Sequence, residues 1–196
     1  NGDDSYDGKA AVWAGGTSTV GPRKSLVAIM KVAKYDGDIV YAAEGTYANE
    51  AIKVVAGGGT QTGNYRVSIP AGVSLIASGR QDMTIIEGQP ATGASLDESP
   101  YGCGSDAVRG VYLNSGSVVK GFTIRKCYAA PGWGSSYYGG GAAGGGYVID
   151  CHLTGNVAPR GAGSCGPTAI RCRYDGNRGN WTGTDMQGGN AFNCLF

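Results

Sequence analysis

Residues 151–156 read CHLTGN, residues 172–177 read CRYDGN and residues 194–196 read CLF, so a cysteine recurs after 21 and then after 22 residues. Self-similarity at a period near 22 residues is the mark of a repeat architecture. In each unit a large apolar residue stands two places before the cysteine and another two places after it, which is the alternation of a strand with one buried face. The repeat therefore predicts that its three cysteines face inward at equivalent positions. They are Cys151, Cys172 and Cys194.

The two complete units also share a Gly-Asn pair at the same offset, and both residue types adopt the left-handed backbone of a turn at little cost. A unit of this length is too short for the strand and helix of an α/β fold, but it suits three short strands joined by turns. Stacked units of this kind form a parallel β-helix, in which equivalent residues lie ~4.8 Å apart. We therefore expect Asn156 and Asn177 to stack at one corner, where their amides can bond each other. An outward column should be formed by Asp150, Arg171 and Asn193.

The composition agrees with one all-β domain of 196 residues. Its 37 glycines fit short strands joined by many tight turns, and they lack the strict period of collagen. The 16 basic and 15 acidic residues leave a net charge of +1 with no run of like charges, which argues against nucleic acid or an anionic membrane as the main partner. No apolar stretch approaches the ~20 residues of a membrane span.

Six cysteines in a glycine-rich and tyrosine-rich chain favour an exported protein, so we expect an extracellular or cell-surface location. Neighbouring residues of a parallel stack have Cβ atoms about 4.8 Å apart, beyond the ~3.5–4.5 Å of a relaxed disulfide. We therefore interpret the three repeat cysteines as buried thiols. Any disulfide would instead involve the cysteines outside the repeat, which are Cys103, Cys127 and Cys165.

Only residues 23–35 have the pattern of a helix, with apolar residues on one face and lysines on the other. The end of a β-helix needs a cover over its apolar interior and its strand edges, so we assign this helix as the N-terminal cap. Residues 1–22 would precede it as an extension, and residues 36–196 would form the stacked β-helix. Residues 88–105 and 129–146 have no strand periodicity and are expected to be loop excursions.

The repeats LTGN and YDGN, together with Gly-Gly-Ala at residues 140–142, resemble the repeats of polymorphic outer-membrane proteins and other bacterial right-handed β-helix proteins of the pectin-lyase-like superfamily. Residues 36–49 (DGDIVYAAEGTYAN) resemble the segment that leads into the first strands of such proteins. Residues 66–76 (RVSIPAGVSLI) resemble a strand pair that follows it. The resemblance implies a right-handed β-helix whose capping helix leads directly into the stack.

Pectin-lyase-like folds often house polysaccharide lyases and glycoside hydrolases, which need several carboxylates or a calcium site on one outer face. The outward column offers only the charged residues Asp150 and Arg171, which we interpret as a surface ion pair and as weak candidates for catalysis. His152 has no second ligand at metal spacing. No cofactor is expected, apart from a weaker Ca²⁺ alternative at the acidic start of the chain, where solvated Asx turns are the simpler interpretation. The candidate calcium ligands are Asp3, Asp4 and Asp7.

Aromatic residues in the glycine-rich loops are the candidates for ligand binding. Flat rings with polar edges suit sugar stacking or protein contacts, and the alternative is that they fold back over the side of the strands. These residues are Trp133, Tyr137, Tyr138 and Trp181.

These observations favour a non-catalytic structural or adhesive role in a secreted or cell-surface protein. The alternatives are a carbohydrate-active enzyme, either a lyase or a hydrolase, and a glycan-binding module with a polysaccharide partner. Residues 194–196 stop in mid-repeat, with no helix or charged strand to cover the last unit. We expect that end to be covered either by the rest of a longer chain or by head-to-tail stacking of copies into a filament, because uncovered strand edges promote association.

Overall fold

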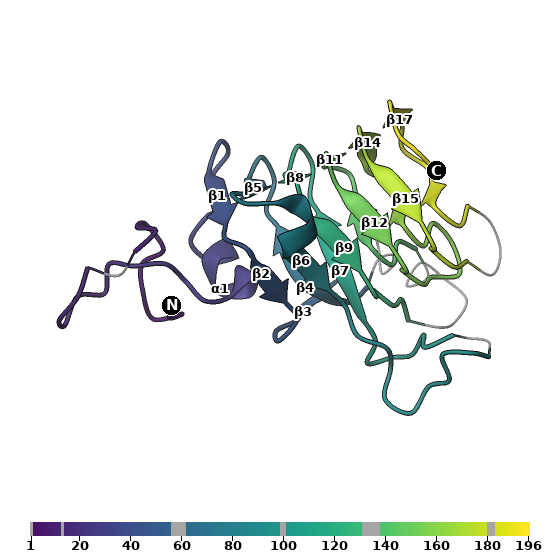
Figure 1. The fold of residues 1–196 in the computed structure, drawn as a ribbon, viewed down its shortest axis with the longest axis horizontal. Coiled ribbons are helices and arrows are strands. Elements are labelled where there is room, and N and C mark those ends of the chain that lie inside the picture. Colours follow the sequence, from purple (N-terminus) through teal and green to yellow (C-terminus); the bar gives the residue numbers. More distant parts are fainter. Residues whose placement is uncertain (1, 13, 56–61, 99–100, 131–137, 180–182) are drawn as a thin grey trace.

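The strands form three sheets whose neighbouring members follow one another along the long axis of the molecule (Figure 1). This computed structural model describes residues 2–12, 14–55, 62–98, 101–130, 138–179 and 183–196. Sheet 1 consists, in order, of β1 (Ile39–Ala42), β5 (Ser74–Ala77), β8 (Val118–Lys120), β11 (Tyr147–Ile149), β14 (Thr168–Ile170) and β17 (Ala191–Phe192). Sheet 2 consists of β2 (Gly45–Tyr47), β6 (Thr84–Glu87), β9 (Thr123–Arg125), β12 (His152–Thr154) and β15 (Arg173–Asp175). Sheet 3 consists of β3 (Ile52–Val54), β4 (Gly63–Ile69), β7 (Val108–Leu113), β10 (Ala142–Gly144), β13 (Ser164–Cys165) and β16 (Met186–Gln187).

Apart from β3 and β4, which share sheet 3, consecutive strands belong to different sheets, and from β5 onward every third strand returns to the same sheet. We call one passage of the chain through the three sheets a circuit. The strand pairs within the sheets are parallel, except that β3 pairs with β4 in an antiparallel fashion. The described residues also contain the short α-helix α1 (Leu26–Met30) and a 3-10 helix over Gln81–Met83. The protein is therefore nearly all β, with parallel sheets and one α-helix.

The core lies between the sheets, and each sheet contributes a column of inward side chains. In sheet 3 the inward residue shrinks from Val111 to Ala142 and then to Ser164 in successive circuits. Sheet 2 compensates for the lost volume, because its inward column enlarges from Leu153 to Tyr174. The Tyr174 hydroxyl lies 2.8 Å from Ser164 Oγ, so the ring spans the interior while its polar atom keeps a hydrogen bond.

Left-handed backbone forms both corners of sheet 2. Asp150 occupies the corner before this sheet with a φ of 52°, a region that costs a non-glycine residue roughly 1–2 kcal/mol. Residues at this corner in four circuits share that conformation, and they are Gly121, Asp150, Arg171 and Asn193. At the corner after sheet 2 the equivalent residues are Lys126, Gly155 and Gly176.

The corner before sheet 2 corrects one feature of the predicted alternation. Ile149 and Cys151 are two places apart, yet they do not share a face, because the left-handed Asp150 between them turns the chain. Cys151 points into the core, whereas Ile149 ends β11 on the outer side of sheet 1 and stays partly exposed. Only the large residue after the cysteine, Leu153 in this circuit, is on the buried side.

The start of α1 differs from the helix predicted over residues 23–35, and those bounds were wrong. The Asp4 carboxylate accepts hydrogen bonds from the Lys24 and Ser25 N–H groups at 2.9 and 2.8 Å. These bonds hold the chain extended up to Ser25, whose hydroxyl then caps the helix by accepting from the Ala28 N–H at 3.1 Å. A contact with the distant N-terminal extension therefore decides where the helix begins.

The end of α1 is also earlier than predicted. The Asp38 carboxylate accepts hydrogen bonds from the Lys34 and Tyr35 N–H groups at 3.0 and 2.9 Å, which turns the chain toward β1. Leu26 and Met30 of α1 belong to the core, and α1 lies at the N-terminal end of the sheets (Figure 1).

Residues 129–146, predicted to be one loop excursion, contain the strand β10. Ala142 of this strand lies beside Val111 of β7 and Ser164 of β13, so the sheet continues through the predicted loop. The glycine-rich sequence hides the strand because the inward residue is only an alanine. Between β6 and β7 the described residues 88–98 and 101–105 contain no strand, and a small apolar cluster forms within and beside this segment from Ala91, Ala107 and Tyr128.

Candidate functional site

Charged side chains gather on the outer side of sheet 2, where they alternate along each strand with the buried column. We call this surface the charged face. It is built from the last residue of β6 and β9, the first residue of β12, and both ends of β15. Its members are Glu87, Arg125, His152, Arg173 and Asp175.

Both carboxylates of the charged face are held by cations. Asp175 Oδ2 lies 3.0 Å from His152 Nε2 and 2.8 Å from an Arg173 nitrogen. A hydrogen bond from Thr154, reinforced by His152 and Arg173, lowers the pKa of the Asp175 carboxyl. On the neighbouring strands, Glu87 Oε2 accepts from Arg125 Nε at 2.6 Å.

Asp150 and Arg171, the weak catalytic candidates, lie at equivalent corner positions of adjacent circuits. Arg171 donates through Nε and a terminal nitrogen to both carboxylate oxygens of Asp150, at 2.6 and 2.9 Å. Lys120 Nζ lies 3.9 Å from the same carboxylate. The hydrogen bond from Arg171 lowers the pKa of the Asp150 carboxyl.

This arrangement limits the acid–base chemistry that the surface can perform. A general acid at neutral pH needs a carboxyl group whose pKa is raised, usually by burial or by a like charge. Asp150 and Asp175 instead have lowered pKa values and are partly exposed. The Asp150 and Asp175 carboxylates are therefore poor proton donors. His152 is the candidate general base of this surface, because Asp175 orients its ring.

The repeat cysteines lie in one column directly after the corner between sheets 1 and 2. Cys151 and Cys172 are 1% and 3% exposed and belong to the core, and Cys194 packs against it. The Cys172 N–H donates to Cys194 Sγ at 3.4 Å, so neighbouring members touch along the stack. Burial raises the pKa of the Cys172 thiol to about 11. None of the cysteines is in a disulfide, Cys103, Cys127 and Cys165 included.

The two repeat asparagines follow the second corner and contact each other. Asn156 Nδ2 donates to Asn177 Oδ1 at 3.0 Å and to the Ile124 carbonyl at 3.0 Å. Asn156 Oδ1 accepts from the Cys127 N–H at 3.1 Å. Cys127 thus occupies the asparagine position of the preceding circuit, which explains its departure from the spacing of the other cysteines.

The acidic residues of the N-terminal extension bind backbone groups rather than one another. Asp3 Oδ1 accepts from the Ser5 N–H at 2.8 Å, Asp7 Oδ1 accepts from the Lys9 N–H at 3.0 Å, and Asp4 holds the start of α1. Among the residues that the structure describes, no three His, Cys, Asp or Glu side chains converge where they could hold a metal ion.

Of the predicted ligand-binding aromatics, Trp133, Tyr137 and Trp181 lie outside the described residues. Tyr138 is described and half-buried, and its hydroxyl accepts from an Arg160 guanidinium nitrogen at 3.0 Å. The same guanidinium lies 5.6 Å from the centre of the Tyr138 ring. The role of these aromatics in binding stays a prediction.

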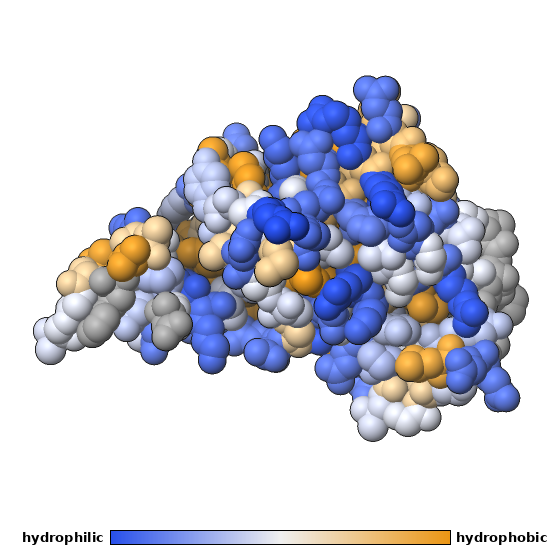
Figure 2. All heavy atoms as spheres, in the orientation of Figure 1, coloured by the Kyte–Doolittle hydropathy of each residue, from blue (hydrophilic) through white to orange (hydrophobic). Residues whose placement is uncertain are grey.

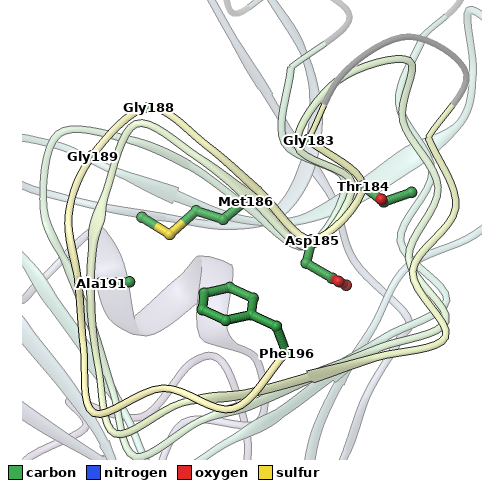
Figure 3. A pocket seen from close by; sticks show the side chains of 8 residues that line it. All are labelled: Gly183, Thr184, Asp185, Met186, Gly188, Gly189, Ala191 and Phe196. Atoms are coloured by element: carbon green, nitrogen blue, oxygen red, sulfur yellow. The ribbon is translucent and has the colours of Figure 1, made fainter.

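The C-terminal end of the stack forms a second candidate surface. Phe196 stacks on Tyr174 with ring centres 5.1 Å apart, yet it remains 60% exposed, and Leu195 is 63% exposed. Figure 3 shows Phe196, Met186 and Ala191 around the interior of the last circuit, which is a shallow hollow widely open to solvent. Figure 2 shows hydrophobic residues gathered at this end of the molecule.

Sequence reasoning identified Asp150 and Arg171 but missed the contact of His152 with Asp175. Part of this contact could have been predicted, because the 21-residue offset that pairs Cys151 with Cys172 also places His152 beside Arg173, two residues before Asp175. Which side of the sheet the Asp175 side chain faces could not be predicted in this way. Asp175 is the last residue of β15, and it faces outward only because the strand keeps its alternation up to the next corner.

Comparison of the chain with protein-family models, with curated proteins and with solved structures finds no match. Within the part of the chain that the structure describes, no helix has the length and apolar character needed to cross a membrane.

Proposed function

We propose that the chain is a non-catalytic structural or adhesive module of a secreted or cell-surface protein, and that copies of it associate end to end. In this proposal the three sheets are the faces of a right-handed parallel β-helix of the pectin-lyase-like kind. The return of every third strand to the same sheet, always with parallel pairing, supports this architecture. Such a stack is a stiff rod, a shape suited to a structural or adhesive part.

The observation that carries the proposal is the contrast between the two ends. At the N-terminal end α1 covers the core with Leu26 and Met30. At the C-terminal end, Leu195 and Phe196 are exposed over the interior of the last circuit, and the described residues contain no strand beyond β16 and β17. Apolar surface bordered by unpaired strand edges favours association, either with the rest of a longer chain or with a second copy, and our proposal takes the second copy.

A head-to-tail contact fits the direction of the sheets. Sheets 1 and 2 end at the N-terminal side in the edge strands β1 and β2, and their strands are parallel throughout. The last strands of one copy could therefore continue both sheets of the next copy without a change of direction. The contact joins different surfaces of the two copies and continues the long axis of the sheets, so each end keeps a free surface and the contact would propagate into a filament.

The charged face supports a non-catalytic role. Each carboxylate on it, and Asp150 at its margin, is bound by a cationic side chain at hydrogen-bonding distance. Glycosidases and lyases instead hold carboxylates free to exchange protons or to bind calcium. The exposed ion pairs of this face, worth only ~0–1 kcal/mol each, act mainly as solvated surface.

Electron microscopy and sedimentation velocity of the purified chain test the end-to-end association. We expect threads with an axial repeat of one subunit, and we expect the double substitution Leu195→Asp with Phe196→Asp to abolish them. The matched control is Met83→Asp, which places the same charge on a residue that is 48% exposed in the 3-10 helix. A wild-type chain that stays monomeric at high concentration would overturn the proposal, as would threads that survive the double substitution.

An enzymatic function is the second candidate, because His152 is oriented by Asp175 at 3.0 Å as a general base would be. The test is an activity screen on polygalacturonate, alginate and neutral β-glucans. Under our proposal none of them is cleaved. Turnover that disappears in His152→Ala, Asp150→Ala or Arg171→Ala, with the fold intact by circular dichroism, would replace the structural assignment with a carbohydrate-active one.

A further inference from the structure

The outer side of sheet 1 is apolar, in contrast to the charged face on sheet 2. The strand registers place its side chains in two columns, one with a residue from each of the six strands and one with a residue from each strand except β17. One column consists of Tyr41, Ile76, Lys120, Ile149, Ile170 and Phe192. The other consists of Ile39, Ser74, Val118, Tyr147 and Thr168. We call these eleven positions the apolar face.

Packing within the chain does not account for these side chains. The core contacts of sheet 1 are made by the alternate residues of the same strands, such as Val40, Leu75 and Val119. On the apolar face, Tyr41 is 67% exposed, Ile39 and Phe192 are each 55% exposed, and Tyr147 is 41% exposed. These exposed groups stand on β1, β11 and β17, whereas Ile76, Val118, Ile149 and Ile170 are partly buried. A group of large apolar side chains left in water on one face is a known mark of an interaction surface.

The size of the face matches a specific protein interface. A fully exposed aromatic side chain offers about 150–250 Å², so the exposed fractions leave roughly 500–700 Å² of apolar surface over the two columns. That area exceeds most of the range of about 300–600 Å² for the largest patch on a typical monomer. It approaches the ~800 Å² that each partner contributes to a standard interface.

The single charge within the face is neutralised from its own chain. Lys120 lies in the first column, and its ammonium is 3.9 Å from the Asp150 carboxylate, which Arg171 also binds. The aliphatic stem of Lys120 therefore continues the apolar column while its charged end is paired at the margin. A partner with a strong charge would find no complementary charge here, which favours a neutral and apolar surface.

The shape of the apolar face further restricts the kind of partner that fits it. Its residues stand on parallel strands ~4.8 Å apart, which makes the surface flat and ribbon-like. The two columns are mostly Ile, Val, Tyr and Phe, and only Ser74 and Thr168 offer hydroxyls besides those of the tyrosines. A hydrated polysaccharide needs many hydrogen-bond partners, whereas a second flat apolar sheet needs none.

We propose that two copies of this chain pack face to face through the outer side of sheet 1. The apolar faces would lie ~10 Å apart, the ordinary spacing of packed sheets. Together they would bury roughly 1,000–1,400 Å², at the lower end of the range for stable protein interfaces. The contact is independent of end-to-end association, and where both occur it joins two filaments side by side.

Sedimentation equilibrium of the chain with Leu195→Asp and Phe196→Asp tests the pairing, because these changes remove end-to-end contacts. We expect a dimer in this background. Adding Tyr147→Glu should weaken the dimer at least about tenfold, because it places two like charges in an apolar contact. Tyr41→Glu serves as a second variant from the other column. Met83→Glu, which adds the same charge at an exposed apolar residue of the 3-10 helix outside the two columns, should leave the dimer unchanged.

The outcomes separate the pairing from the end-to-end proposal. Circular dichroism and thermal melting first establish that each variant is folded. A monomer in the end-blocked background at high concentration would overturn the pairing, and so would a dimer that both glutamate variants leave intact. A monomer that adsorbs to an insoluble β-glucan through Tyr41 and Tyr147 would assign the face to a flat glycan and would likewise overturn it.

Discussion

Asn156 illustrates how a polar side chain can lie inside this protein. It is 0% exposed, and its side chain uses both of its amide hydrogens and its oxygen in bonds to Ile124, Asn177 and Cys127. Buried polar groups are tolerated when their hydrogen bonds are complete. The repeat predicts this contact because it places two asparagines at one offset, although it could not foresee that the backbone of Cys127 supplies the third partner.

Replacing this side chain should therefore be costly. We expect Asn156→Ala to lower the free energy of unfolding by about 2–4 kcal/mol, since it removes the side-chain partner of the buried Cys127 N–H and one hydrogen bond of the buried Ile124 carbonyl. Urea denaturation with a fluorescence readout measures the change. Asn177→Ala is the matched control and should cost less, because Asn177 is only partly buried and water can reach the groups it leaves. Equal losses in the two variants would contradict this account.

The corner residues mark a limit of prediction at the same scale. Asp150 and Arg171 each adopt a positive φ that a non-glycine residue rarely takes. Nothing in a simple two-residue alternation reveals such a corner, so the sequence predicted that Ile149 and Cys151 share a buried face. The apolar face of sheet 1 could not be recognised for the same reason, because its isoleucines were counted as core.

Among the elements, the strands were easier to predict than the helix. The strands β7, β12 and β15 combine large inward residues with regular offsets, and tertiary contacts do not alter their alternation. The helix was predicted over residues 23–35 from periodicity alone, whereas Asp4 and Asp38 bind the backbone on either side of α1 and shorten it. Contacts from outside a segment cannot be read from the pattern within it.

The short helix α1 nevertheless packs against the core, and a substitution in α1 should lower the stability of the whole molecule. Leu26 is 5% exposed and lies over the core at the N-terminal end. We expect Leu26→Ala to lower the free energy of unfolding by about 2–4 kcal/mol, the usual range for truncating a buried leucine. Thermal and urea unfolding measure the loss.

Val32→Ala provides the comparison for this element. Val32 follows the helix and is 36% exposed, so its truncation should cost less than about 1 kcal/mol. If the two variants unfold at the same urea concentration, α1 does not cover the core. The contrast between a covered N-terminal end and an exposed C-terminal end would then no longer support end-to-end association.

At the scale of the whole molecule, the repeat predicted a nearly all-β chain with parallel strands, which the structure has, and the loops concealed part of it. From β11 to β17 one passage through three sheets takes 21 and then 22 residues, as the partners Tyr147 and Thr168 and the partners Ala169 and Ala191 show. The passages from β5 to β11 are longer, because longer segments separate β6 from β7 and β9 from β10. Sheet 3 was the hardest to foresee, because its inward residues diminish to Ala142 and Ser164 between glycines. The large ring of Tyr174 fills the space from the opposite sheet, a compensation that becomes visible only when the circuits are stacked.

The buried thiols give the folded molecule a predictable response to alkaline pH. Burial raises the pKa of Cys103, Cys165 and Cys172 to about 11 and that of Cys127 to about 12, from an ordinary value of 9.0. Because the folded state holds these protons more tightly than the unfolded chain, the protonated thiols stabilise the fold fully below pH 9. Above pH 9 the unfolded chain releases protons first, and this stabilisation falls until the pH passes the folded values.

We therefore expect the free energy of unfolding to be constant up to about pH 9 and then to fall by about 1.4 kcal/mol per thiol at one pH unit higher. Urea titrations at several pH values, in the presence of a reductant, measure the decline. Other groups also titrate in this range, so Cys127→Ala is compared with the unmodified chain at each pH. The variant starts less stable because it leaves a small cavity, but it should lose less stability between pH 8 and pH 10, by about one thiol's share. If the free energies of unfolding of the two proteins fall equally with pH, the Cys127 thiol is accessible to solvent. That result would contradict its buried position, equivalent to that of Asn156 in the next circuit.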